Sequence, residues 1–238
     1  MVKTKWTDIQ DGRLDKAVVI DFEGFEKMPP ALCGVWIDGE LEQVVFQKEL
    51  EPAARYTEEK DNRRIYYKEL DVFLDELIET VLDDEDRLFI AFSKRELELL
   101  QDHHKGVGDR YVNALPVAKK WREGLFPSAA EKAKANRRKW KKGLNKSKVA
   151  KNRYYNKVGF RLVDYWRLAG IKVPATHGVR KTTKWLREVL DALEKKSGLA
   201  ESLSAGQKKA WTRFVNHNRR DVVNLYELLK IILEQYES

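Results

Sequence analysis

The chain has 238 residues, of which 42% are hydrophobic, a fraction that is ordinary for a globular protein with a sizeable core. Its only cysteine, Cys33, excludes an internal disulfide and a zinc site built from several cysteines. The formal net charge of +8 favours an anionic partner. No apolar run is long enough to span a bilayer, and the polar N-terminus lacks the apolar core of a signal peptide, so we expect a cytoplasmic protein.

The first part of the chain has the patterns of β-strands. A β-branched and apolar run over 17–25 predicts a strand that leads into two carboxylates. The runs ALCGVWIDG and LEQVVFQ follow, and the pair Asp38 and Gly39 between them is typical of a hairpin turn. These patterns predict three antiparallel strands at the start of the chain. An amphipathic pattern then predicts a helix over roughly 61–82.

The rest of the chain is mainly helical in pattern. A short buried strand, RLFIAFS, leads directly into the helical run KRELELLQ, and YVNALPV is the last predicted strand. After Arg161 we expect only helices, the last of them over about 205–237. Strands followed by helices, with one strand-to-helix crossover, predict an α/β or α+β layer fold with a mixed sheet. We expect a single domain over 1–238 with a basic helical insertion at about 128–160.

Asp21 and Glu23 form the first acidic pair. Residues two apart on a strand project to the same side, so the two carboxylates share one face. Adjacent carboxylates next to an apolar run are costly unless a positive charge lies between them, and divalent magnesium or manganese would supply it. The alternative is that the strand ends here and both side chains are solvated. The pair alone favours neither interpretation.

Two later segments add further candidates. Glu96 lies on the first turn of the helix after RLFIAFS, where ligands collect at the carboxyl end of a strand, although a glutamate here also stabilises a helix dipole. Glu98 competes with Glu96, and the apolar pattern does not decide between them. His217 and Asp221 lie one helical turn apart, as a capping pair, a salt bridge, or a general base beside a metal ligand. We expect His177 to lie beside a helix cap.

Taken together in chain order, these acids and His217 resemble the motifs of the DEDD-type 3′–5′ exonucleases of the ribonuclease H-like superfamily. Within that group the chain is most similar to the predicted ribonuclease H-like branch whose last motif has the form Tyr-Asn-x-x-Asp-Val. Asp21 and Glu23 in VIDFEGF match the Asp-x-Glu first motif. Glu96 in SKREL matches the second acid, and Asp221 in HNRRDV matches the third. His217 takes the place of the tyrosine or histidine that handles the attacking water.

The resemblance implies a ribonuclease H-like fold and two-metal hydrolysis of phosphodiester bonds in single-stranded DNA or RNA, with two Mg²⁺ or Mn²⁺ ions as cofactors. Asp21 is expected to bridge both ions, and Glu23, Glu96 and Asp221 to complete their ligands. His217 is expected to accept the proton of the attacking water. No feature of the sequence selects RNA over DNA.

Two departures from the family pattern support other hypotheses. Glu96 is one carbon longer than the usual aspartate, and His217 has the spacing that is usual for tyrosine. Both are compatible with a nucleic-acid-binding module that keeps the fold but has weak catalysis. An endonuclease with the same four acids is the third hypothesis.

A basic stretch follows the strands. Between Glu131 and Arg161 there are thirteen Lys or Arg residues and one acid, a net +12 that leaves about −4 for the rest of the chain. Cations interleaved with aromatic residues suit phosphates and unpaired bases, so we predict binding of single strands or 3′ ends; the alternative is a solvated arm. The residues predicted to bind nucleic acid are Arg137, Arg138, Lys139, Trp140, Lys141, Lys142, Lys146, Lys148, Lys151, Arg153 and Tyr154.

Overall fold

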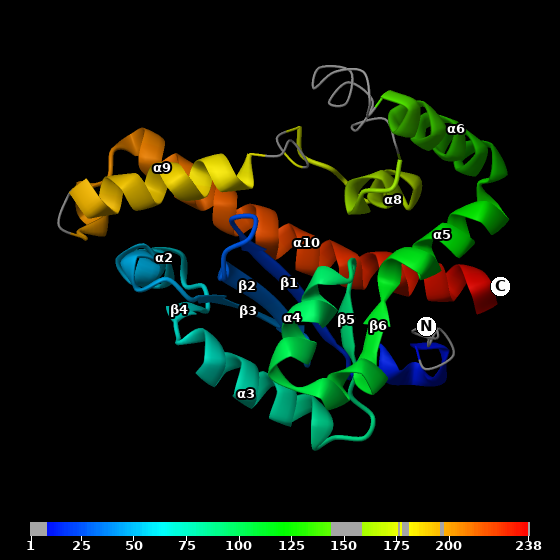
Figure 1. The fold of residues 1–238 in the computed structure, drawn as a ribbon, viewed down its shortest axis with the longest axis horizontal. Helices are drawn as coiled ribbons and strands as arrows, with labels where there is room; N and C mark the ends of the chain where they lie inside the picture. The colour runs from blue at the N-terminus through cyan, green and yellow to red at the C-terminus, as the bar shows by residue number, and fades with distance from the viewer. Residues whose placement is uncertain (1–8, 144–158, 176, 178–180, 196–197, 238) are drawn as a thin grey trace.

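The computed structural model describes residues 9–143, 159–175, 177, 181–195 and 198–237. Within these residues the chain forms a six-stranded mixed sheet with the strand order β4-β3-β2-β1-β5-β6 (Figure 1). The strands are β1 (Val18–Gly24), β2 (Pro30–Ile37), β3 (Glu40–Val45), β4 (Ile65–Tyr67), β5 (Phe89–Ala91) and β6 (Tyr111–Asn113). The predicted α/β class with a mixed sheet is therefore confirmed.

The centre of the sheet is the predicted antiparallel meander β1-β2-β3. Asp38 and Gly39 join β2 to β3 with φ of 51° and 83°, as the hairpin signal predicts. On its other side β1 pairs in parallel with β5, and β5 pairs in parallel with β6. The strand that carries the first acidic pair therefore lies inside the sheet, and its position is fixed by neighbours on both sides.

Helices cover both faces of the sheet. They are α2 (Glu51–Asp61), α3 (Leu70–Leu82), α4 (Arg95–His103), α5 (Ala114–Leu125), α6 (Pro127–Gly143), α8 (Leu162–Leu168), α9 (Thr182–Lys195) and α10 (Ala205–Glu237). The short turns are a π-helix at Ile9–Arg13 and 3₁₀ helices at Lys48–Leu50, Lys105–Arg110 and Ala200–Ser202. Figure 1 shows the long α10 running along one face of the sheet, where it contacts β1, β2 and β3.

Side chains of β1 alternate between two parts of the core. Val18 and Ile20 pack with α3 and α4, whereas Val19 packs with α10. Because the side-chain period of a strand is two residues, Asp21 and Glu23 lie on the same side as Val19. The predicted shared face of the two carboxylates is confirmed, and it is the face that α10 covers.

The helix predicted over roughly 61–82 is wrong in its first part. Asn62 has a left-handed backbone, with φ of 49°, and ends α2, a helix that the sequence patterns did not predict. Ile65 then starts β4, which pairs in parallel with β3. A helix begins only at Leu70. Sheet pairing therefore overrides the helical pattern at the beginning of this segment.

The predicted basic insertion begins as a helix, because α6 covers its first half and packs on α5. Residues 144–158 lie outside the described residues. In the part of the chain that is described, no helix combines the length and the apolar character needed to cross a membrane.

Candidate metal centre

Three predicted acids meet between β1 and α10. Oxygen atoms of Asp21, Glu23 and Asp221 all lie within 4.8 Å of one another. The side chains of Glu23 and Asp221 are each 16% exposed, so the cluster is largely withdrawn from water but still accessible. The fold thus brings acids from the two ends of the chain into one group.

Asn218 fixes the geometry of this group. Its Nδ2 donates to the main-chain oxygen of Asp21 at 2.7 Å and to Asp21 Oδ2 at 2.9 Å. Its Oδ1 accepts from Gln43 Nε2 at 2.8 Å, and the same nitrogen donates to the main-chain oxygen of Val215. Gly34 makes room for the amide, because a Cβ atom there would lie 2.5 Å from Asn218 Oδ1. This buried network of hydrogen bonds therefore holds the Asp21 carboxylate in one position.

The structure distinguishes the two glutamates of α4. Glu96 is 6% exposed, and its Oε2 accepts a hydrogen bond from Ser93 Oγ at 2.5 Å, whereas Glu98 is exposed. Glu96 acts electrostatically on both Asp21 and Glu23, so it faces the same cluster. It does not belong to the three residues whose oxygens lie within 4.8 Å of one another.

Two histidines complete the cluster. His217 Nε2 lies 3.4 Å from Asp221 Oδ2 and 3.6 Å from Glu23 Oε1. His177 Nε2 lies 2.8 Å from Asp221 Oδ1, and the Nδ1 atoms of the two rings are 3.1 Å apart. The Trp166 ring packs on the His177 ring at 4.7 Å. His177, expected beside a helix cap, instead lies buried at the centre of the site.

These contacts select one neutral arrangement of the histidine protons. If His177 Nε2 donates to the Asp221 carboxylate, His177 Nδ1 has no proton and must accept. His217 Nδ1 then donates to His177 Nδ1, which leaves the lone pair of His217 Nε2 directed at the carboxylate cluster. The histidine pair therefore presents a proton acceptor to the group of acids.

Burial and neighbouring carboxylates raise the pKa of Asp21 and Glu23. Burial raises the pKa of Asp21 well above its usual range, and Asp221, Glu23 and Glu96 add to the effect. Burial and then Asp221 raise the pKa of Glu23 to about 8, although a hydrogen bond with Thr182 opposes this. Burial also raises the pKa of Glu96 and lowers the pKa of His217. Without a cation, Asp21 and Glu23 therefore keep their protons to a higher pH than exposed carboxyl groups do.

The donor set fits hard divalent cations. Asp21, Glu23 and Asp221 offer only oxygen atoms, which Mg²⁺ and Mn²⁺ prefer, and a cation among them would oppose the rise in the pKa of Asp21 and Glu23. His177, His217 and Asp221 form a second group within 4.8 Å, with two nitrogens and one oxygen, a set that zinc prefers. Both groups share Asp221, so they are parts of one centre.

The predicted nucleic-acid-binding stretch is only partly described. Its described residues lie on α6, where the four charged side chains are exposed and the indole is half-buried: Arg137, Arg138, Lys139, Lys141 and Trp140. Nothing is described for the Lys142 side chain or for Lys146, Lys148, Lys151, Arg153 and Tyr154. The cations of α6 are therefore on the surface, as phosphate contacts require.

Comparison with protein-family models, with curated proteins and with solved structures gives no match for the chain. Of the residues now found in the centre, His177 and Asn218 were not predicted. Asn218 follows His217 directly and corresponds to the asparagine of the last motif, which was a signal for it. His177 lies in an irregular segment with no periodicity to indicate its direction.

Proposed function

We propose that the protein is a metal-dependent 3′–5′ exonuclease that hydrolyses single-stranded DNA or RNA. The observation that carries the proposal is the meeting of Asp21, Glu23 and Asp221 within 4.8 Å, with Glu96 buried beside them. Two strand residues and one helix residue reach this arrangement from opposite ends of the chain. Among the described residues, no lysine or arginine forms an ion pair with any of the three. A cation site explains why these acids are held together.

Each residue has a role in this proposal. Asp21, Glu23, Glu96 and Asp221 would hold the cations, and Asn218 keeps the Asp21 carboxylate in place. Mg²⁺ or Mn²⁺ bound there would lower the pKa of a water and stabilise charge on the leaving 3′ oxygen.

His217 Nε2 is the proton acceptor for the attacking water. Burial keeps this imidazole neutral at physiological pH, so that its lone pair is available. His177 is a positioning residue: it orients the His217 ring through Nδ1 and holds Asp221 through Nε2.

The resemblance to the DEDD-type exonucleases supports the same assignment. The first motif lies on the first strand of the mixed sheet, and the second acid lies at the start of the helix after β5. The third acid lies on the helix that packs on β1. This arrangement supports a ribonuclease H-like fold as part of the proposal.

One observation favours a second candidate, a nucleic-acid-binding module with weak catalysis. Glu96 lies outside the tight group of three acids and is hydrogen-bonded to Ser93. If Glu96 keeps this partner when nucleic acid binds, only three carboxylates remain for two cations.

The test uses 5′-labelled single-stranded DNA and RNA with purified protein, in magnesium and then in manganese. We expect a ladder that shortens from the 3′ end and that Glu96→Gln strongly weakens. Glu98→Gln is the matched control, because Glu98 lies on the same helix but is exposed. Binding without cleavage in either metal would select the second candidate, and internal fragments would indicate an endonuclease.

A further inference from the structure

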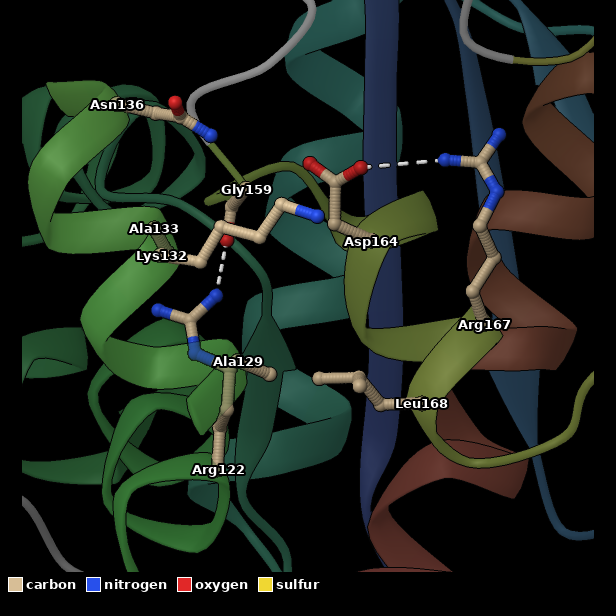
Figure 2. A pocket seen from close by; sticks show the side chains of 9 residues that line it. All are labelled: Arg122, Ala129, Lys132, Ala133, Asn136, Gly159, Asp164, Arg167 and Leu168. Carbon is tan, nitrogen blue, oxygen red and sulfur yellow. Dashed lines mark hydrogen bonds and ion pairs between the residues drawn. The ribbon is translucent and has the colours of Figure 1, made fainter. Parts of the chain in front are cut away.

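A second feature of the molecule is a pocket of about 640 Å³ between α6 and α8, to which Arg122 of α5 also contributes. None of its described lining residues belongs to the acidic cluster. Figure 2 shows the side chains of Arg122, Lys132 and Asn136 on one side of the pocket and those of Arg167 and Leu168 on the other. Its volume lies within the range of about 300–1,000 Å³ that is typical of sites for small ligands.

The pocket has a positive balance of charge. Asp164 is the one acid among its described lining residues. Its carboxylate already accepts hydrogen bonds from Arg161 Nε and Nη2, at 3.1 and 3.0 Å, and from Arg167 Nη1 at 3.2 Å. Two arginines therefore neutralise Asp164, and no lining carboxylate remains for Arg122 and Lys132.

Arg122 is a buried cation that is held in place. Its residue is 3% exposed, and its guanidinium carbon lies 4.7 Å from the ring centres of both Phe160 and Tyr165. Nη1 donates to the main-chain oxygen of Gly159. Within the described residues Nε has no hydrogen-bond partner and no carboxylate pairs with the guanidinium. A buried charge without an ionic partner is costly, and an anion bound beside the guanidinium would lower that cost.

Further cations surround the same aromatic ring. Lys119 Nζ and the Arg137 guanidinium lie 5.2 and 5.1 Å from the centre of the Phe160 ring, which Arg122 also contacts. Burial, and then the charges of Arg137 and Arg122, lower the pKa of Lys119. Three cations around one ring repel one another, and a bound anion would remove this repulsion.

We propose that this pocket binds one phosphate-bearing nucleotide unit of a single strand, upstream of the 3′ end that enters the acidic cluster. The identity of the ligand rests on the proposed function. The phosphate contacts Arg122, Lys132 and Arg167, and the apolar wall that includes Leu168 takes part of the sugar or base.

Helix α8 connects the two sites. Its Trp166 packs on His177 of the acidic cluster, whereas its Arg167 and Leu168 line the pocket. The two sites therefore share one helix of seven residues, so one bound strand can contact both.

The experiment measures binding without cleavage, so that it is independent of catalysis. Fluorescence anisotropy in EDTA gives the Kd of labelled single strands of about 12 nucleotides for the full chain and for Lys132→Ala/Arg167→Ala. Both side chains are exposed, so the double variant is expected to fold. The control Lys195→Ala/Lys209→Ala removes two exposed cations from α9 and α10.

We expect the pocket variant to weaken binding by about tenfold and to reduce the slope of the salt dependence by about 1.4. The control variant should change binding less than twofold. Equal affinity of the pocket variant and the parent would overturn the proposal, and so would an equal weakening by the control variant. Absence of cleavage in magnesium or manganese would refute the exonuclease alone, because binding is measured without metal.

Discussion

Gly34 on β2 pairs with Asp21 on β1, at the place where α10 packs on the sheet. A Cβ atom at this position would lie 2.5 Å from Asn218 Oδ1 and 2.9 Å from Val222 Cγ2. Asn218 is completely buried and bonded on both sides, to Gln43 and to Asp21, so it cannot turn away without losing partners. We therefore expect Gly34→Ala to push α10 away from β1 or to break the Asn218 network.

The expected loss of stability in Gly34→Ala is the sum of two free-energy costs. Extra volume in a filled core costs about 1–3 kcal/mol, and a buried polar group left without its partner costs about 1–3 kcal/mol. In a domain of this size each kcal/mol lowers Tm by about 2–4 °C. If each cost lies near the lower end of its range, Gly34→Ala lowers Tm by about 4–8 °C. It should also weaken Mn²⁺ binding, because the Asp21 carboxylate loses the donor that positions it.

Thermal unfolding followed by circular dichroism measures the first effect, and calorimetric titration with Mn²⁺ measures the second. Gly124→Ala on α5 is the matched control: a Cβ atom there meets no described atom within 4 Å, and alanine is the better helix former. We expect this control to leave Tm unchanged or to raise it.

A double-mutant cycle separates the clash from a general loss of packing. In an Asn218→Ala background the nearest clashing atom is absent, so Gly34→Ala should cost less there than in the parent protein. An unchanged Tm in Gly34→Ala would refute the reasoning. An equal cost in both backgrounds would show that Asn218 is not the group that Gly34 accommodates.

Three further predictions concern the acidic centre. Asp221→Asn should abolish cleavage in a strand-shortening assay while the far-ultraviolet circular dichroism spectrum stays that of the parent; residual cleavage near the parent rate would contradict the assignment. His177→Phe keeps an aromatic ring against Trp166 but removes both hydrogen bonds, so cleavage or Mn²⁺ affinity should fall by about 10–100-fold, and unchanged values would exclude a positioning role. In EDTA the folded state holds the proton of Glu23 up to a pKa of about 8, against 4.5 when unfolded, so Tm should fall as pH rises between these values. Saturating Mg²⁺ should remove this dependence of Tm on pH. A Tm that rises with pH in EDTA would contradict the raised pKa of Glu23.

Local periodicity explains which parts of the fold were predictable. The period of two on a strand was sufficient to place Asp21 and Glu23 on one face, and the helical period was sufficient to place His217 one turn from Asp221. The strand β4 was not predictable in this way. It has only three residues, and it exists because Ile65 pairs with Gln43 of β3, a contact that no local pattern encodes.

Local sequence patterns could not decide between Glu96 and Glu98 either. Both lie in the first turn of α4, Leu97 lies between them, and Leu99 and Leu100 follow Glu98. Only the packing of α4 against the sheet buries Leu97 and Leu100 and thereby turns Glu96 inward and Glu98 outward. The direction of a side chain near a helix start depends on which face the rest of the fold covers.

His177 was not predicted as a site residue, although the proposed mechanism depends on it. Nothing near it in sequence marks it as part of the site, yet it is the one described group that contacts both His217 and Asp221 by hydrogen-bond distances. Its Nε2 requires a proton to donate to the Asp221 carboxylate, and in a neutral His217 this leaves Nε2 unprotonated toward the acids. A tyrosine at position 217 could not accept a proton in this way while neutral. The orientation of the histidine at position 217 therefore depends on a second histidine that a distant segment of the chain supplies.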